Sequence, residues 1–241
     1  MRVFSINSNY ENKNTLSCGA IVKNKLPKTI KQSDNEIVDK FLCVVSGPSG
    51  CGKDSLLNGF DEKYGFFKRV VTCTTREPRA GEVDGVDYYF VSEEEFENRI
   101  KQGRFLEFAK FVGNFYGTPM EEVQRLLANG DEVVLEIEVE GAMQVKAKMP
   151  DAVLIFIAPP SYDALKNRLF RRGTESEEII YERLEKAHRE LTLAAGYDYI
   201  VINDDVENAA DRIKAIIRAE HARCRRSLNG YLQLLEENSH E

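Results

Sequence analysis

No run of apolar residues in the 241-residue sequence approaches the ~20 residues that a membrane-spanning helix needs, so we expect no membrane partner. Paired cysteines are missing too, because the five cysteines form an odd set without Cys-x-x-Cys spacing. Such a set is typical of a reduced, cytoplasmic protein rather than a disulfide-bonded secreted one. Positive charge is also scarce: 33 Lys and Arg residues stand against 40 Asp and Glu residues, a formal net charge of −7. This balance argues against a nucleic-acid partner.

The chain is long enough to bury a full core, and we expect one domain with inserted subregions. Residues 1–38 are rich in Asn, Lys, Ser and Thr and show no sustained hydrophobic period. They predict a flexible N-terminal extension. A transit peptide is the less favoured alternative, because this stretch has one arginine and no amphipathic stripe. We expect the domain to cover residues 39–226 and a C-terminal tail to cover residues 227–241.

The sequence FLCVVSGPSGCGKDSLL, residues 41–57, combines a short apolar strand, a glycine-rich turn and the start of a helix at Lys53. The spacing G-x-x-x-x-G-K is typical of a loop that cradles phosphates. Glycines let consecutive backbone N–H groups point inward, the helix N-terminus adds partial positive charge, and Lys53 neutralises phosphate oxygens. The residues of this predicted cradle are Gly47, Pro48, Ser49, Gly50, Cys51, Gly52, Lys53, Asp54 and Ser55.

Asp54 follows the lysine where the general motif has Ser or Thr. A hydroxyl in this turn normally helps to hold the Mg²⁺ that bridges nucleotide phosphates, and Ser55 is the nearest one. We therefore predict Ser55 as the metal-binding residue. Asp54 either supplies an oxygen to the metal site or repels the phosphates.

Residues 72–92, TCTTREPRAGEVDGVDYYFVS, place Arg76 and Arg79 on either side of Pro78, ahead of Tyr88. Guanidinium groups bind phosphate oxygens bidentately, so two arginines beside a tyrosine hydroxyl suit a phosphate monoester. A solvated turn is an equally good interpretation of this stretch alone. We expect one strand from Lys68 to Cys73 to lead into it.

Residues 105–119, FLEFAKFVGNFYGTP, carry Glu107 within an aromatic and apolar run. A carboxylate in such a run costs free energy unless it meets hydrogen-bond donors. Guanine offers N1–H and N2–H₂ side by side on one edge, whereas adenine has no such pair. Tyr116 and Thr118 add hydroxyl groups nearby. The alternative is a glutamate on the wet face of a two-sided strand.

Two later segments also carry charge. Residues 133–139, VVLEIEV, predict a strand with Glu136 and Glu138 on one face, near the edge where parallel sheets bind ligands. Residues 165–184 place Arg168, Arg172 and Arg183 around a glycine, where a closing lid could carry them onto phosphates. A basic solvated helix end is the alternative. We expect a last helix over about 206–226.

Strands alternate with helices along the chain, which predicts an α/β fold with a mainly parallel sheet and helices on both faces. The segment at about 72–120 has no long helix, so we expect a small mixed-sheet insertion there.

Taken together, the chain resembles the guanylate kinase family of ATP:GMP phosphotransferases over about residues 41–219. The resemblance rests on SGPSGCGK, TTREPRAGEVDGVDYYFVS, FLEFAKFVGNFYGTP, LEIEVEG, FIAPPS, RLFRRGTES and VINDD, which occur in family order. It implies a P-loop NTPase-type sheet, a GMP-binding region at about 72–120, a helical lid at about 163–186, and Mg²⁺ as the cofactor with ATP.

The resemblance also implies residue roles. The predicted cradle would bind ATP. The GMP site would consist of Thr72, Arg76, Arg79, Tyr88, Glu107, Tyr116, Thr118 and Glu138, the last standing where the family usually has Asp. The catalytic residues would be Lys53, Arg76, Arg168, Arg172 and Arg183.

Two other functions stay open from the sequence. One is a non-catalytic guanylate-kinase-like module that binds a protein partner, and the other is a related sugar-phosphate kinase. The sequence predicts no oligomeric state.

Overall fold

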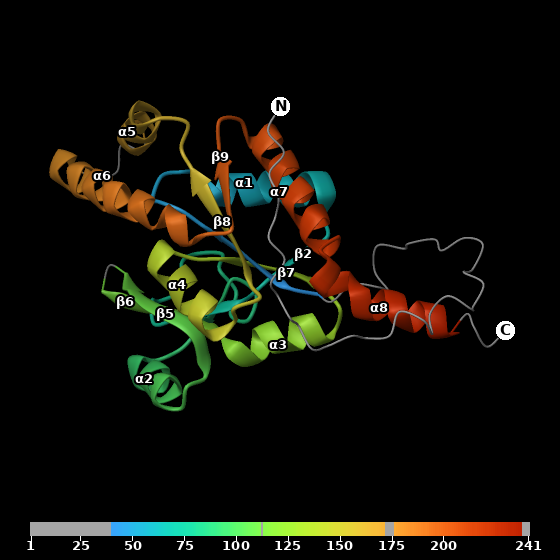
Figure 1. Cartoon of the computed structure of the whole chain (residues 1–241). Coiled ribbons are helices and arrows are strands. Elements are labelled where there is room, and N and C mark those ends of the chain that lie inside the picture. Colours follow the sequence, from blue (N-terminus) through green and yellow to red (C-terminus); the bar gives the residue numbers. More distant parts are fainter. Residues whose placement is uncertain (1–39, 112, 172–175, 238–241) are drawn as a thin grey trace, which may run out of the picture.

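The structure, a computed structural model, describes residues 40–111, 113–171 and 176–237 (Figure 1). The expected flexible extension over residues 1–38 lies outside these ranges. Within them, no helix combines the length and the apolar character needed to cross a membrane.

A five-stranded sheet forms the centre of the described chain, in the order β2-β7-β1-β8-β9. Every neighbouring pair in it is parallel. Its strands are β1 (Leu42–Ser46), β2 (Phe67–Arg69), β7 (Glu132–Glu136), β8 (Val153–Ala158) and β9 (Tyr199–Ile202).

Alternation along β1 separates two cores, because successive side chains of a strand point to opposite faces. Cys43 and Val45 pack on one side with apolar residues of α1 (Lys53–Tyr64) and α7 (Val206–His221). Leu42 and Val44 pack on the other side with α3 (Met120–Ala128) and α4 (Val139–Lys148). The expected parallel sheet with helices on both faces is therefore confirmed (Figure 1).

A second, four-stranded sheet has the order β4-β3-β6-β5. Its strands pair in both senses, parallel between β3 and β4 and antiparallel elsewhere, which confirms a mixed sheet. Phe96 of α2 (Glu93–Lys101) packs in the core of this sheet, and Ser92 caps that helix by accepting from the Glu95 amide. The strands are β3 (Thr72–Thr74), β4 (Tyr88–Phe90), β5 (Phe105–Phe111) and β6 (Asn114–Pro119).

The remaining elements follow β8 in the chain. Helices α5 (Tyr162–Arg171) and α6 (Glu177–Thr192) share a small core of their own and occupy the region of the predicted lid. The short 3₁₀ helix η2 (Leu193–Gly196) leads from α6 towards β9. Helix α8 (Cys224–Glu237) extends away from the sheets in Figure 1.

Several expected boundaries are wrong. The single strand expected over residues 68–73 is two strands, and β2 and β3 belong to different sheets. The strand expected over residues 133–139 ends at Glu136, because the chain turns there and α4 begins at Val139. The helix expected over residues 206–226 is two helices, with a break after His221. Helix α8 continues through most of the stretch that we assigned to a C-terminal tail.

Candidate functional site

The glycine-rich loop joins the end of β1 to the start of α1, as the sequence predicts. A Cβ atom at Gly47 would lie 2.3 Å from the carbonyl oxygen of Ile157 on the neighbouring strand, so only glycine fits there. Gly52, the residue before α1, has φ +89, a left-handed conformation that residues with a Cβ rarely adopt. Close packing against the next strand thus requires the glycine at position 47, and the left-handed backbone favours the glycine at position 52.

Lys53 and Arg168 both bind the main chain of this loop. The Lys53 Nζ donates to the Gly47 carbonyl at 2.7 Å. Arg168, on α5, donates to the carbonyls of Cys51 at 2.9 Å and Asn203 at 2.8 Å. The buried Asn203 side chain also donates to Cys51, at 2.8 Å. Arg168 therefore braces the loop, and Asn203 is a supporting residue that we did not single out from the motif VINDD.

Arg183 reaches the loop from α6. Its Nη2 donates to the Ser49 hydroxyl at 2.6 Å. Arg172, the other arginine of the predicted lid, lies outside the described residues. Cys51 is fully buried, and burial raises the pKa of its thiol, so it is a packing residue rather than a reactive one.

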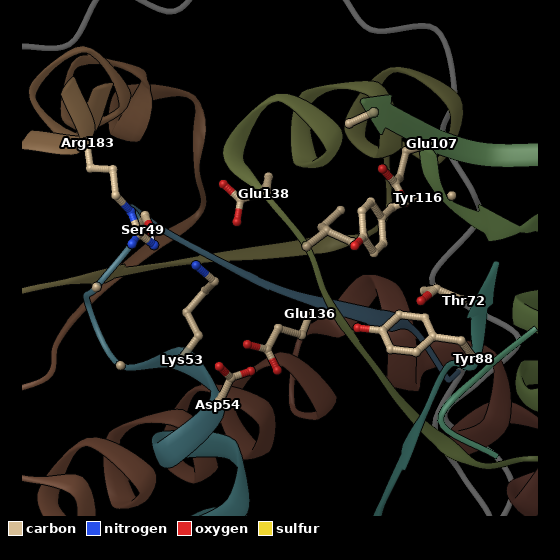
Figure 2. Close-up of a pocket in the computed structure, with 15 residues that line it drawn as sticks. Ser49, Lys53, Asp54, Thr72, Tyr88, Glu107, Tyr116, Glu136, Glu138 and Arg183 are labelled. Atoms are coloured by element: carbon tan, nitrogen blue, oxygen red, sulfur yellow. Dashed lines mark hydrogen bonds between the residues drawn. The ribbon is translucent and has the colours of Figure 1, made fainter. Parts of the chain in front are cut away.

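A cavity of about 400 Å³ opens between the loop and the second sheet (Figure 2). Lys53, Asp54 and Ser49 lie on one side of it in Figure 2, and Glu107 and Tyr116 lie on the other. The structure thus brings most of the predicted ATP-site and GMP-site side chains to one space. The lining residues are Ser49, Gly50, Gly52, Lys53, Asp54, Thr72, Tyr88, Glu107, Ala109, Tyr116, Gly117, Glu136, Ile137, Glu138 and Arg183.

Glu107 is a buried carboxylate on β5, with 4% of its surface exposed. One of its oxygens accepts from the Thr118 hydroxyl of the adjacent strand at 2.6 Å. Burial raises its pKa to about 6, and the bonds from Thr118 and the charge of Lys148 moderate the rise. The other oxygen lies against Gly141 of α4, where a Cβ atom would come within 2.6 Å of it. Glu107 therefore has a fixed position and spare acceptor capacity towards the cavity.

Two tyrosines of the sheet that carries Glu107 lie close to an arginine. The rings of Tyr88 and Tyr116 meet edge to face, with centroids 6.1 Å apart. The Arg76 guanidinium lies 5.5 Å from the Tyr88 ring centroid, and hydrogen bonds with Glu82 and Tyr116 raise its pKa. The Arg79 side chain is exposed, and neither Arg76 nor Arg79 is among the residues that line the cavity. The family resemblance assigns Arg76, Arg79, Tyr88 and Tyr116 to the phosphate of GMP, as a phosphate clamp. Three of these four residues are neighbours in this structure.

Asp54 and Glu136 form a pair of carboxylates near Lys53 (Figure 2). Burial raises the pKa of Glu136 to about 7, and the charge and hydrogen bond of Asp54 add to the rise. Glu136 is the last residue of β7, so it lies at the carboxyl ends of the strands, where parallel sheets bind ligands. The sequence predicted its position at this edge but no role for it.

The Asp54 and Glu136 carboxylates are candidate ligands for the predicted Mg²⁺. Within the described residues no group of three or more His, Cys, Asp or Glu could hold a metal ion. Mg²⁺, however, typically takes one or two carboxylates together with phosphate oxygens and water, and Asp54 and Glu136 would supply the carboxylates of such a set. Ser55 is exposed and does not line the cavity.

Glu138 precedes the first residue of α4 and faces the cavity with its carboxylate. It pairs with Lys186 of α6 at 3.3 Å. Lys186 also lies 3.4 Å from Glu190, whose carboxylate is buried. The sequence did not reveal this link between the two helices, because the three residues belong to separate motifs.

A family model, curated relatives and a solved structure all show similarity to guanylate kinases. A family model described as guanylate kinase matches residues 40–220. The guanylate kinase of Listeria monocytogenes serotype 4b is 50% identical over 197 residues, which cover 81% of this chain and 96% of that protein. The guanylate kinase of Onion yellows phytoplasma is 52% identical over 202 residues, covering 83% and 95%. The crystal structure of guanylate kinase from Anaplasma phagocytophilum superposes with a TM-score of 0.64 at 34% identity, covering 83% of this chain and 95% of that one.

Proposed function

The chain belongs to the guanylate kinase family, and on that premise we propose that it transfers the γ-phosphoryl group of ATP to GMP, giving ADP and GDP. The observation that carries the proposal is that one cavity is shared by both groups of residues. Lys53 and its loop line one side, and Glu107, Tyr88 and Tyr116 line the other. Two anionic substrates bound on these two sides would meet in the middle.

On the donor side we propose that the loop amides and Lys53 hold the ATP phosphates. Arg183, already bonded to Ser49, is placed to add positive charge as the phosphoryl group moves, and Arg168 holds the loop in shape. The role of Arg172 stays a prediction. Bound Mg²⁺ would neutralise the β- and γ-phosphates. We propose that Asp54 and Glu136 make its protein contacts. The metal contact that the sequence predicted for Ser55 stays a prediction.

On the acceptor side we propose that Arg76, Arg79, Tyr88 and Tyr116 bind the phosphate of GMP. Glu107 would accept from guanine N1–H and N2–H₂, with Thr72, Thr118 and Glu138 completing the contacts to the base. The GMP phosphate is an anionic nucleophile near neutral pH, so the reaction needs no general base. Catalysis then depends on positioning the two substrates and on neutralising charge.

Neither alternative from the sequence is favoured. A non-catalytic module would have no need of a complete loop with Lys53 bonded to Gly47, and a sugar-phosphate kinase would have no need of a buried Glu107 held by Thr118. We also propose a reduced, cytoplasmic setting, because Cys43, Cys51 and Cys73 are buried free thiols.

A coupled assay of ADP release tests the proposal. The purified chain with ATP, Mg²⁺ and GMP is expected to turn over, and AMP or UMP in place of GMP is expected to give far slower turnover. Equal turnover of the three acceptors would remove the role of Glu107. Asp54→Ser restores the usual hydroxyl of the motif, which would take over the metal contact that we propose for Asp54. It is expected to keep GMP phosphorylation, because Lys53 and the loop glycines are also unchanged.

A further inference from the structure

Glu82 lies at the base of the predicted phosphate clamp, and neither the sequence nor the family resemblance gave it a role. One oxygen of its carboxylate accepts from Nη2 of Arg76 at 2.8 Å. The other accepts from the backbone N–H of Arg79, also at 2.8 Å. A single carboxylate thus binds both residues that we propose to hold the acceptor phosphate.

The same carboxylate is part of the turn that carries Arg79. The backbone N–H of Glu82 donates to the Arg79 carbonyl at 3.1 Å, which closes a turn between the two residues. Only 19% of the Glu82 side chain and 14% of the Arg76 side chain are exposed. Bonds from Arg76 and from the Arg79 amide lower the pKa of Glu82, so it is ionised at neutral pH.

Arg76 is held from several sides. Its guanidinium lies 5.5 Å from the ring centroid of Tyr88 and 5.8 Å from that of Phe90, distances typical of cation–π contacts. Its Nη1 donates to the Glu77 carbonyl at 2.7 Å. A guanidinium has five N–H donors, so the bonds to Glu77 and Glu82 leave donors for an anion.

We infer that Glu82 is a positioning residue for acceptor binding, which acts through Arg76 and the Arg79 turn to aim the clamp at the phosphate. This inference rests on the proposed function. A flexible arginine would lose several rotatable bonds on binding the phosphate, and one that is already oriented loses less. Because Glu82 is built into the turn by its own backbone bond, it stays in place when the anion binds and does not compete for the same donors.

Steady-state kinetics of Glu82→Gln test this. Glutamine can still accept from Arg76 through its amide oxygen, but its NH₂ group cannot accept from the Arg79 amide. We expect the KM for GMP to rise about tenfold while the KM for ATP is unchanged and kcat at saturating GMP falls less than threefold. In an Arg76→Ala background the added effect of Glu82→Gln on the KM should largely disappear, because the two residues act as a unit.

Glu121→Gln is the matched control. It removes a bridge of similar length, between Arg104 and Glu121 at 2.7 Å, that involves neither Arg76 nor Arg79. This variant should leave the KM for GMP unchanged. Calorimetry with GMP and with guanosine adds a second readout: Glu82→Gln should weaken GMP binding and leave guanosine binding intact, because guanosine has no phosphate.

Three outcomes would overturn the inference. A lower KM for GMP in Glu82→Gln would make Glu82 a competitor for the clamp. A parallel rise of both KM values with a lower melting temperature would make its role structural. An unchanged KM would leave it no role in binding. Failure of the unaltered chain to phosphorylate GMP would instead contradict the proposed function, so the two failures are distinguishable.

Discussion

The two sides of the cavity are built in different ways. On the side of the parallel sheet, one continuous stretch of about a dozen residues supplies the loop, Lys53 and the helix N-terminus. On the side of the mixed sheet, Thr72, Tyr88, Glu107 and Tyr116 come from four different strands and meet only when those strands pair. The first side depends on local backbone shape, and the second depends on tertiary assembly. We therefore expect changes on the two sides to affect different kinetic parameters.

Lys53→Ala should produce the largest effect, and on the loop side alone. Removing the ammonium takes away charge from the moving phosphoryl group, so we expect kcat to fall about 10³-fold. GMP affinity should stay close to that of the unaltered chain, because the hydrogen bond of Lys53 is to Gly47 in the loop. Single-turnover kinetics and GMP calorimetry would check this. Loss of GMP binding would break the division into two sides.

Glu107→Gln should produce the next largest effect, confined to the mixed-sheet side. The amide keeps the size of the side chain but offers one acceptor oxygen instead of two, and it places N–H₂ donors where guanine also has donors. We expect the KM for GMP to rise on the order of 10²-fold with the KM for ATP unchanged. Thr118→Val, which removes the 2.6 Å bond to Glu107 together with the contact to the base that we propose for the Thr118 hydroxyl, should give a smaller change in the same direction.

Gly141→Ala sharpens the comparison, because it acts on Glu107 without changing any residue that we assign to a substrate. The added Cβ would lie 2.6 Å from the Glu107 carboxylate, so that group must shift. A small displacement of a binding group costs rate, and we expect the KM for GMP to rise about tenfold. Gly196→Ala is a control of the same chemistry at a position without a positive φ, where the added Cβ would meet only the flexible side chain of Met143, at 3.2 Å. Equal effects of the two variants would contradict the explanation.

The pH dependence of guanosine binding should show the smallest effect. Glu107 has a pKa of about 6, and only its ionised form accepts two hydrogen bonds from guanine. Affinity should therefore be full above pH 7 and fall as the pH drops through 6, by about fourfold at pH 5.5. Guanosine is the probe because the phosphate of GMP itself titrates near pH 6. The dependence should be absent in Glu107→Gln, and a flat profile in the unaltered chain would place the pKa of Glu107 lower.

The same contrast explains what the sequence predicted well. The loop from Gly47 to Lys53 could be predicted because its spacing, strand and helix are contiguous. Glu107 could be predicted because a carboxylate inside an aromatic run needs partners. Asn203, Glu82 and Lys186 could not, since their partners lie far along the chain or within a turn whose geometry the sequence does not determine.

Element boundaries were missed for a related reason. Residues typical of strands recur through 68–73 (KRVVTC) and 133–139 (VVLEIEV) with no glycine or proline between them, so each sequence predicted one strand. In the fold, β2 ends at Arg69 because β3 joins the other sheet, and β7 ends at Glu136 because the chain turns into α4. Tertiary pairing, which periodicity does not report, determines both ends.

The passage of the chain from one sheet to the other has a consequence for how this protein can vary. Only residues 70 and 71 separate β2 from β3, and beyond them Thr72 borders the cavity while Cys73 is fully buried. Because neighbours along a strand face opposite ways, deleting or inserting one residue in this connector would turn the thiol outward and the hydroxyl inward. Val70 is a buried core residue, so only conservative apolar substitutions there would leave the fold intact. A change of length in the connector would instead exchange the roles of the next two residues.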